Sequence, residues 1–478
     1  MVSRDPAVGL PDELAVEGAK KATIEHGLFV ILLRVKKSTF KKLSIRTVGC
    51  RLNQYETERM VADLYRYGFR RAKKGEPADL YIINTCTVTH RADQSSRNMI
   101  SRAVRENPDA SVVVAGCYVD SDPDRIAAME GVDVLLPNAD KERIGEILPE
   151  RLPELFAEQP ETSCAATYPP FSNYNRSWLK ISDGCNQNCS FCVLPAVRGR
   201  LRNRPPLEIL DEVNALVENG FNEVVLTGVH VGHYRYRRGE PRVKNLAGLC
   251  RLILEGSELK KLRISSIEPQ MVSDELVDTY TQMSGRICRH LHVPLQSGSP
   301  RILRLMRRPY TQNFYVRRLA LVKETVPEMI VGADVIVGFP GETNEDFERT
   351  RRICESGLID YLHVFSYSDR PGTPAAELPH KVKPDVIKRR NAILTRISGD
   401  FRARSHQRQV GLVLDVIAER RQKDKGFFWG ISDNYVRVKM PPEFTGGRQI
   451  VRVRVRSARE DYVEGELVDV EHPLPASP

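Results

Sequence analysis

The hydrophobic pattern of residues 41–153 alternates between short apolar runs and longer amphipathic stretches. The apolar runs predict strands at 43–48, 79–84, 111–115 and 132–136, and the amphipathic stretches predict helices from about residue 54 to Gly68 and from 92 to 106. Strands that alternate with helices are typical of a parallel sheet with helices on its faces. We therefore expect an open parallel α/β sheet at 41–153, preceded by an N-terminal extension at 1–40.

The same alternation continues through residues 171–401, after a proline-containing linker around Tyr168-Pro169-Pro170. Strands are predicted at 178–182, 223–226, 262–265, 290–293, 331–337 and 361–365, with helical segments between them. Strand-helix units in this number predict a partial parallel (β/α)6 barrel. The strand ends of such a barrel can hold a small cofactor, and its open side can admit a large substrate.

The pattern changes to a period of two within residues 402–470. Apolar and polar residues alternate at 413–416, at 435–438 and most regularly at 451–456, which predicts a small β barrel. Three arginines then share one exposed face: Arg452, Arg454 and Arg456. With the aromatic residues at 427–429 nearby, this face is typical of a nucleic-acid-binding module, although a solvated outer face gives the same pattern.

Three cysteines lie on one predicted loop directly after the strand at 178–182. Cys185, Cys189 and Cys192 have the spacing CxxxCxxC, with Phe191 before the last of them. Three thiolates can hold three irons of a 4Fe-4S cube and leave the fourth iron open, whereas most electron carriers and structural zinc sites use four ligands. The spacing therefore predicts a cluster with a reactive iron, and not three cysteines that are neighbours by chance.

Cys50, Cys86 and Cys117 each come shortly after the end of a successive predicted strand. Because the carboxyl ends of parallel strands share one edge of a sheet, we expect these thiols to converge as the ligands of a second cluster. Isolated core thiols placed by chance are the alternative. The neighbouring polar residues are Asn53, Asn84 and Thr85. They either donate hydrogen bonds near that cluster or act as helix caps and turn formers.

Other residues at the ends of the barrel strands suit a small cofactor. The predicted contacts are Phe191, Thr227, Gly228, Glu268 and Gly338. A glycine lets the backbone approach a ligand closely, and a glutamate can bind a ribose hydroxyl or an ammonium group. A surface carboxylate and a tight turn are the plainer interpretations of Glu268 and Gly338. Three histidines in apolar strands are predicted to be buried core residues: His290, His292 and His363.

Composition narrows the class of protein. Lys and Arg number 72 against 62 Asp and Glu, and the net charge of +10 favours a polyanionic partner, although a solvated basic surface has the same charge. The four remaining cysteines (Cys164, Cys250, Cys288 and Cys354) show no pairing rhythm, so we expect no disulfides and a reducing cytoplasm. The apolar run at 28–33 is too short to cross a bilayer and lacks a cleavage site, so no membrane association is expected.

The motifs resemble those of the radical S-adenosylmethionine (SAM) methylthiotransferases over residues 41–470. The N-terminal pattern of that family is matched by TVGCRLNQYETE at 47–58, NTCTVT at 84–89 and AGC at 115–117. The branch that acts on threonylcarbamoyladenosine in tRNA is resembled by DGCNQ at 183–187, LTGVH at 226–230, SSIEP at 265–269 and PGTPA at 371–375. The run at 194–199 is less aromatic than is usual in the family, which puts local contacts in doubt.

The resemblance implies a methylthiotransferase N-terminal cluster domain at 41–153, a radical SAM core at 171–401 and a TRAM RNA-binding domain at 402–470. The small cofactor is then SAM, cleaved at the cluster of Cys185, Cys189 and Cys192. The auxiliary cluster of the other three cysteines carries or supplies sulfur. The implied reaction converts threonylcarbamoyladenosine beside the anticodon into its 2-methylthio derivative.

The implied partners are tRNA, an electron donor of flavodoxin or ferredoxin type, and a sulfur source. Three other functions stay open. Close relatives modify isopentenyladenosine in tRNA or an aspartate of a ribosomal protein, and a nonenzymatic RNA-binding iron-sulfur protein would carry the same clusters. Formation of methionine and deoxyadenosine from SAM by the reduced protein separates an enzyme from such a binding protein.

Overall fold

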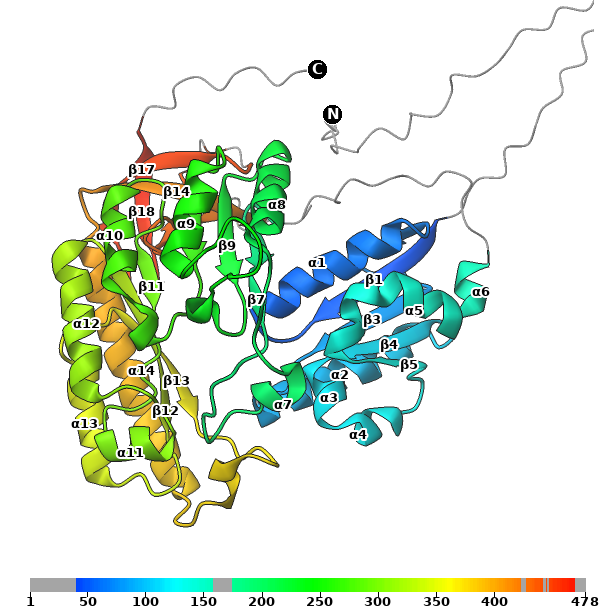
Figure 1. Cartoon of the computed structure of the whole chain (residues 1–478), viewed down its shortest axis with the longest axis horizontal. Helices are drawn as coiled ribbons and strands as arrows, with labels where there is room; N and C mark the ends of the chain where they lie inside the picture. Colours follow the sequence, from blue (N-terminus) through cyan, green and yellow to red (C-terminus); the bar gives the residue numbers. More distant parts are fainter. Residues whose placement is uncertain (1–39, 158–173, 423–426, 442–443, 445–446, 469–478) are drawn as a thin grey trace, which may run out of the picture. The chain divides into compact units, whose positions relative to one another are not determined.

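The computed structural model describes residues 40–157, 174–422, 427–441, 444 and 447–468. Its N-terminal part is a parallel sheet in the order β2-β1-β3-β4-β5 (Figure 1). The strands are β1 Lys41–Thr47, β2 Phe69–Arg71, β3 Leu80–Thr85, β4 Ser111–Gly116 and β5 Val134–Leu136. The helices are α1 Arg51–Tyr65, α2 His90–Glu106, α3 Cys117–Ser121, α4 Pro123–Ala127, η1 Asn138–Arg143, α5 Ile144–Arg151 and α6 Pro153–Phe156.

Both faces of this sheet are buried. Ile82 on β3 packs with Leu64 of α1 and Leu148 of α5, whereas Ile83, its neighbour in sequence, packs with Ile100 of α2 on the other face. Successive side chains of a strand point to opposite faces, so a strand covered on both sides is apolar throughout. This explains the continuous apolar runs in the sequence.

The central part contains two three-stranded parallel sheets, in the orders β10-β9-β6 and β11-β12-β13. Isolated bridges from Leu262 to Ile287 and from Ser266 to His292 join β10 to β11, so six strands form one curved, open sheet. The strands are β6 Ser177–Lys180, β9 Glu223–Thr227, β10 Lys261–Ile264, β11 His290–His292, β12 Ile330–Val337 and β13 Tyr361–Ser366. The predicted partial (β/α)6 barrel is confirmed.

Helices cover the outer face of this barrel and bury one large hydrophobic core with it. They are α8 Pro206–Glu218, α9 Leu246–Glu255, α10 Asp274–Gln282, α11 Pro300–Leu305, α12 Gln312–Thr325 and α13 Asn344–Cys354. Shorter elements follow strand ends: β7 Ser182–Asp183, α7 Leu194–Arg198, β8 Arg202–Asn203, η2 Val231–His233, η3 Pro269–Met271 and η4 Pro374–Glu377.

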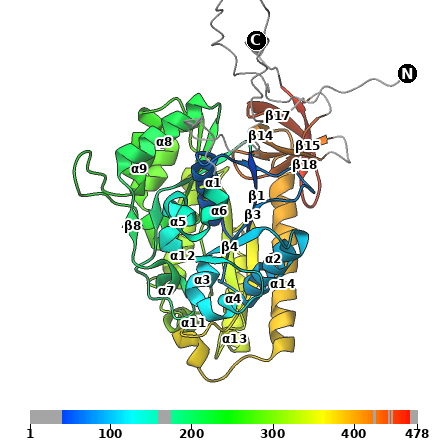
Figure 2. The same cartoon turned by 90° about the vertical axis from the view of Figure 1, so that its right-hand side faces the viewer.

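The long helix α14, Pro384–Gln407, packs on β13 and leads into the C-terminal barrel (Figure 2). The barrel is closed in the order β14-β15-β16-β18-β17. Its strands are β14 Val413–Gln422, β15 Phe427–Ser432, β16 Arg437–Lys439, β17 Ile450–Ala458 and β18 Val463–Leu467. Along β17, Val451, Val453 and Val455 are buried, as the period of two predicts. The domain change predicted at residue 402 falls inside α14.

The sequence did not indicate β2, β15 or β18. The extension at 1–40 lies outside the described residues except for residue 40, as do the linker around Pro169 and Cys164. The other nine cysteines are free thiols. In the described part of the chain, no helix is both long enough and apolar enough to cross a membrane.

Candidate functional site

The three cysteines of the barrel lie on one loop that begins directly after β7. Gly184 opens the loop with a φ of +70°, and the amide of Cys185 donates to the carbonyl of Gly199 at 3.0 Å. Ser190 fixes the middle of the loop, because its amide donates to Met306 at 3.2 Å and its hydroxyl donates to the Leu305 carbonyl at 2.7 Å. The thiols are therefore positioned by a backbone that is held on two sides.

A buried arginine lies against this loop. Arg308 is 3% exposed, its Nη1 is 3.0 Å from Sγ of Cys189, and its Nη2 forms an ion pair with Glu268. Burial raises the pKa of the Cys192 thiol to about 12 and raises the pKa of Cys185 as well. The guanidinium therefore places a positive charge beside the cysteine loop, and the thiolate is the form of cysteine that binds iron.

The structure brings the three N-terminal cysteines together at one edge of the parallel sheet. Cys50 precedes α1, Cys86 follows β3 and Cys117 begins α3. A Cβ built on Gly49 would lie 2.6 Å from Cβ of Cys86, so these two loops touch. Burial raises the pKa of Cys86 to about 11, and the nearby charges of Cys50 and Cys117 act in the same direction. The convergence expected from the strand ends is thus observed, and the role of these thiols as ligands stays a prediction.

Asn53, Asn84 and Thr85 tie the loops of this site to one another. The Nδ2 group of Asn53 donates to the carbonyls of Val48 at 2.8 Å and Thr85 at 2.9 Å. Asn84 donates to the carbonyl of Asn53 at 2.8 Å, and the Thr85 hydroxyl donates to Ala115 at 2.6 Å. None of the three is the residue that caps α1 or α2, since those positions belong to Cys50 and Thr89. Their hydrogen bonds fix the geometry of the strand ends.

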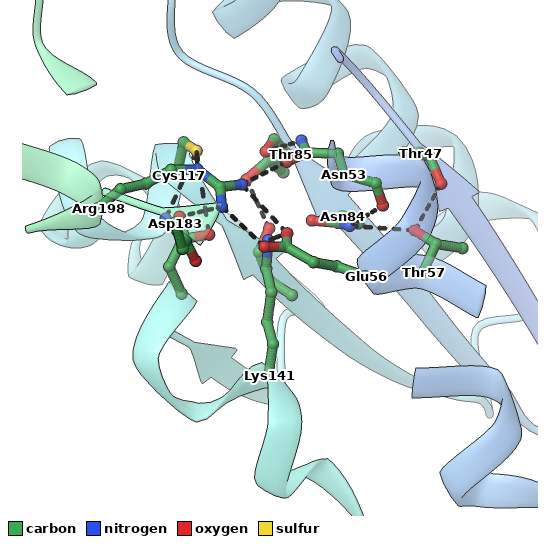
Figure 3. A network of polar contacts seen from close by, with 12 residues as sticks. Thr47, Asn53, Glu56, Thr57, Asn84, Thr85, Cys117, Lys141, Asp183 and Arg198 are labelled. Atoms are coloured by element: carbon green, nitrogen blue, oxygen red, sulfur yellow. Dashed lines mark hydrogen bonds and ion pairs between the residues drawn. The ribbon is translucent and has the colours of Figure 1, made fainter. Parts of the chain in front are cut away.

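Arg198 joins the two cysteine sites (Figure 3). It is 4% exposed and comes from α7 of the barrel part, yet its Nε is 3.3 Å from Sγ of Cys117. Its guanidinium also contacts Glu56 at 2.7 Å and Asp183 at 3.2 Å, and Asp183 accepts the amide of Gly184 at 2.7 Å. One side chain therefore connects Cys117 to the residues that open the loop of Cys185.

The charges of this network are balanced. Burial opposes the ionisation of Glu56, but Lys141 at 2.7 Å and Arg198 hold the pKa of this carboxyl well below its usual range. Burial also disfavours the charge of Arg198, but Glu56, Cys117 and Asp183 raise its pKa well above the usual value. Sequence reasoning missed Arg198, because its contacts depend on the packing of two domains.

Neither cysteine triad is packed for a single metal ion. Within the described residues, the one group of three His, Cys, Asp or Glu whose ligand atoms all lie within 4.8 Å of one another is His292, Asp334 and His363. Sulfurs on a tetrahedral zinc at about 2.3 Å lie about 3.8 Å apart. The wider spacing of both triads suits a cube in which each thiolate binds a different iron and the fourth iron stays open.

The residues predicted to contact a cofactor have partners within the chain. Phe191 packs with Phe339 beside the cysteine loop. The Cβ position of Gly228 is 2.5 Å from Oγ of Ser182, and that of Gly338 is 2.4 Å from Ile387, so each glycine permits a close approach within the fold. Thr227 is buried at the end of β9, where its carbonyl accepts the amide of Ile181. Glu268 pairs with Arg308.

Two other side chains, His230 and Gln270, suit a polar ligand better than the predicted cofactor contacts do, although the sequence did not assign them to the cofactor. Both ring nitrogens of His230 and both amide atoms of Gln270 are buried and have no hydrogen-bond partner among the described residues. Burial, the neighbouring His233 and Arg308 together lower the pKa of His230 to about 3. Buried polar groups are rarely unpaired, so this wall near Arg308 has the donors and acceptors for a ligand with amino, carboxylate or hydroxyl groups.

The C-terminal barrel presents the arginines and aromatic rings that its sequence predicts. Of the three arginines predicted to share an exposed face, Arg452 and Arg456 are exposed and Arg454 is half-buried; Arg456 forms an ion pair with Glu466. On neighbouring strands the Arg437 guanidinium lies 3.8 Å from the ring centroid of Trp429, and the Lys439 ammonium lies 5.3 Å from that of Phe427. Rings with adjacent cations suit stacking on nucleic-acid bases.

Comparison with known families matches both cysteine-bearing regions. Residues 42–137 match the family described as "Uncharacterized protein family UPF0004", and residues 179–354 match the "Radical SAM superfamily". Proteins of the second family use SAM and a 4Fe-4S cluster.

The solved structures extend the match to the fold. A radical SAM methyltransferase, TsrM from Kitasatospora setae, solved with cobalamin and a [4Fe-4S] cluster, aligns with a TM-score of 0.52 at 15% identity. The alignment covers 70% of this chain and 77% of that protein. At this identity the likeness shows the fold alone.

Curated relatives cover nearly the whole chain. "Threonylcarbamoyladenosine tRNA methylthiotransferase MtaB" of Bacillus subtilis is 37% identical, over 90% of this chain and 96% of the relative. The protein of the same name in Aquifex aeolicus is 36% identical over 83% and 96%. A "tRNA-2-methylthio-N(6)-dimethylallyladenosine synthase" of Syntrophobacter fumaroxidans is 33% identical over 89% and 95%. With this coverage, two cysteine triads and the matching fold, the chain belongs to the radical SAM methylthiotransferases.

Proposed function

We propose that this chain transfers a methylthio group to carbon 2 of N6-threonylcarbamoyladenosine in tRNA. The observation that carries the proposal is the pair of three-cysteine sites, contributed by two domains and joined through the buried side chain of Arg198. Methylthiolation of an aromatic carbon needs both a radical and a sulfur source, because such a carbon offers no acid-base handle. Two distinct sites in direct connection meet both needs.

Cys185, Cys189 and Cys192 hold the cluster that binds SAM in this proposal. When bound, the cluster and SAM supply the radical chemistry. Arg308 supplies a positive charge 3.0 Å from Sγ of Cys189, and its pairing with Glu268 offsets that charge. The unpaired groups of His230 and Gln270 give the bound cofactor hydrogen-bond partners near that loop.

Cys50, Cys86 and Cys117 hold the auxiliary cluster, which is the place for the transferred sulfur. Arg198 supplies a positive charge 3.3 Å from Sγ of Cys117. Asn53, Asn84 and Thr85 donate hydrogen bonds to backbone carbonyls of neighbouring segments, and these bonds hold the three cysteine-bearing segments in fixed positions relative to one another. Burial of Cys86 and Cys117 restricts the access of water to that cluster.

The C-terminal barrel is the TRAM domain of this proposal and contacts tRNA through Arg452, Arg456 and the rings near Trp429. The net charge of +10 supports a polyanionic substrate. An electron donor of flavodoxin or ferredoxin type and a separate sulfur source complete the reaction, and the cytoplasm provides both.

The test uses reconstituted enzyme with SAM, a reductant and a sulfur source. It is given matched tRNAs that carry either the threonylcarbamoyl or the dimethylallyl group, and the nucleosides are analysed by mass spectrometry. We expect the 2-methylthio derivative of the threonylcarbamoyl nucleoside and none of the other. Relatives with the first substrate in their names are 32–37% identical to this chain, and relatives with the second are 30–34% identical.

Two results would contradict the proposal. Preference for the dimethylallyl tRNA would move the chain to the other branch, with the chemistry unchanged. Absence of SAM cleavage by the reduced, fully reconstituted protein would leave a nonenzymatic RNA-binding iron-sulfur protein.

A further inference from the structure

A group of polar side chains lies on the inner face of the barrel, between the cysteine loop and the C-terminal barrel. Along β12, Ala333 and Val335 pack in the outer core, so Asp334 faces the other side. On the face of Asp334, Ile336 packs against the core cluster around Phe339 that Phe191 of the cysteine loop also packs against, and Ile330 packs with the C-terminal barrel. At about 3.3 Å per residue, Asp334 lies roughly 7 Å along the strand from Ile336 and roughly 13 Å from Ile330.

Asp334 holds two histidines from the neighbouring strands. Its Oδ1 atom is 2.8 Å from Nε2 of His292 and 3.4 Å from Nδ1 of His363. Burial opposes the ionisation of Asp334, but these two contacts hold the pKa of this carboxyl well below its usual range. The imidazole rings stack at 4.9 Å with an angle of 29°. The carboxylate therefore fixes the orientation of both rings.

The two histidines differ in exposure. The side chain of His292 is 10% exposed, and its Nδ1 is 3.3 Å from the hydroxyl of Tyr361, so both of its nitrogens have partners. His290 is buried as well. The side chain of His363 is 56% exposed, which contradicts the expectation that it is a buried core residue. With Nδ1 directed to Asp334, Nε2 of His363 points away from the cluster.

The surroundings of His363 suit a nucleotide. It lines a cavity of about 430 Å3 with Tyr361, Tyr435 and Arg437, beside the C-terminal barrel. Phe365, two residues farther along β13 on the same face, is 43% exposed, and the two ring centroids are 6.5 Å apart. An exposed ring next to an oriented imidazole offers a stacking surface for a base and a hydrogen-bonding group for a substituent.

We propose that His363, oriented by Asp334, is a specificity-determining residue that hydrogen-bonds the polar N6 substituent of the substrate adenosine. This inference rests on the proposed function. A threonylcarbamoyl group carries a carboxylate, a hydroxyl and ureido N–H groups, whereas a dimethylallyl group is a hydrocarbon. When His363 is neutral and donates Nδ1–H to Asp334, its Nε2 accepts from a hydroxyl or N–H group. When it is protonated, Nε2–H donates to the carboxylate. Both states need a polar substituent.

The experiment compares parent enzyme with His363→Phe, which keeps a ring and removes the hydrogen bond, and with His363→Gln, which keeps a polar group. Rates are measured on matched threonylcarbamoyl and dimethylallyl tRNAs, and kcat and KM are determined separately. Loss of one hydrogen bond to a charged group corresponds to about a 10- to 100-fold loss. We expect a loss of this size in kcat/KM for the threonylcarbamoyl tRNA, mainly through KM, with a smaller loss in His363→Gln.

The selectivity ratio between the two tRNAs decides the outcome. If His363→Phe keeps the selectivity ratio of the parent, the inference about His363 is wrong, whereas the activity of the parent on threonylcarbamoyl tRNA still supports the proposed function. If the parent itself prefers dimethylallyl tRNA, both the inference and the proposed function are wrong. If His363→Phe loses its iron, His363→Gln decides, and its ratio must shift in the same direction. Asp334 and both histidines also have ligand atoms within 4.8 Å, so bound metal is measured by mass spectrometry. If the parent holds one equivalent of zinc and His363→Gln loses it, then His292, Asp334 and His363 form a metal site and the inference is wrong.

Discussion

The two cysteine sites reach similar chemistry by different routes. In the barrel, one loop carries all three thiols, and its own hydrogen bonds position them. In the N-terminal sheet, three separate loops each bring one thiol to a common edge. The first site is local in sequence, and the second exists only when the sheet is assembled.

Each site has one buried arginine beside one thiol, and the environments of these arginines differ. Arg308 contacts Cys189 at 3.0 Å and pairs with Glu268, whose side chain is 17% exposed. Arg198 contacts Cys117 at 3.3 Å and pairs with Glu56, whose side chain is 4% exposed. Without Arg198 the buried Glu56 would keep only Lys141 as a partner and could not gain water in exchange, whereas a partly exposed carboxylate such as Glu268 can be solvated. The assembled site therefore depends more strongly on its arginine for stability.

The largest effect is expected from removing the thiols of one site. Replacing Cys185, Cys189 and Cys192 together by Ala should halve the iron and abolish SAM cleavage, since the proposed function places SAM at that cluster. The matching change at Cys50, Cys86 and Cys117 should also halve the iron but should spare cleavage. Iron analysis and quantitation of deoxyadenosine check both.

The matched control is Ala at the three buried cysteines outside the two sites, Cys250, Cys288 and Cys354, which should keep all of the iron. Parent protein that binds only one cluster's worth of iron after anaerobic reconstitution would sink the two-cluster assignment.

A smaller effect should separate the two arginines. Arg198→Met keeps much of the side-chain volume and removes one of the two cations beside the buried Glu56, so it should lower the stability of the N-terminal domain by about 1 to 3 kcal/mol. Arg308→Met should lower the stability less, because its carboxylate partner Glu268 is closer to solvent. It should instead reduce SAM cleavage, because Arg308 contacts Cys189 of the barrel site. Thermal unfolding followed by circular dichroism, with cleavage assays on the same samples, tests the contrast. Equal loss of stability in both variants would show that burial of the partner does not decide the cost.

The sequence predicts those features of the two sites that depend on local segments, and it does not predict those that depend on contacts between domains. The strand ends near Cys50, Cys86 and Cys117 could be located because apolar runs mark the strands, and parallel strands end at one edge. The contacts of Arg198 could not, since they join α7 to α1 across a domain boundary. Gly228 was predicted to approach a ligand, and the structure gives it Ser182 as a close neighbour. A glycine in the sequence indicates that another group can lie close to its backbone, but it does not show whether that group is a ligand or another part of the chain.

His363 illustrates a second limit. An apolar strand predicts buried side chains on both faces, and this holds for His290 and His292. β13 is the last strand of an open barrel, however, so the face that carries His363 has no further strand beside it. The short strand β2 was missed for a related reason, because two of its three residues are arginines. The exposure of a strand's side chains depends on where the strand lies within its sheet, and the sequence of the strand alone does not give that position.

The smallest effect concerns the glycines that precede the first cysteine of each site. Gly49 has a φ of +107° and a Cβ there would lie 2.9 Å from Sγ of Cys86, whereas a Cβ on Gly184 would lie 2.2 Å from the carbonyl oxygen of Arg200. Gly49→Ala should therefore lower the occupancy of the N-terminal cluster and spare SAM cleavage, and Gly184→Ala should do the reverse. Gly75→Ala is the matched control, since Gly75 has a φ of +83° and nothing within 4 Å of its Cβ position.

All three changes carry the strain of a left-handed residue, roughly 1 to 2 kcal/mol, so only contact with the neighbouring loop distinguishes them. Iron content and SAM cleavage are measured for the four proteins in parallel, with the parent as reference. Because the Cβ of Gly49 would meet a cysteine ligand and that of Gly184 would meet backbone that closes the loop, the losses should fall on different clusters. If Gly49→Ala kept as much iron as Gly75→Ala, the contact between the loops of Cys50 and Cys86 would not control the assembled site, and its geometry would depend on the arginine network alone.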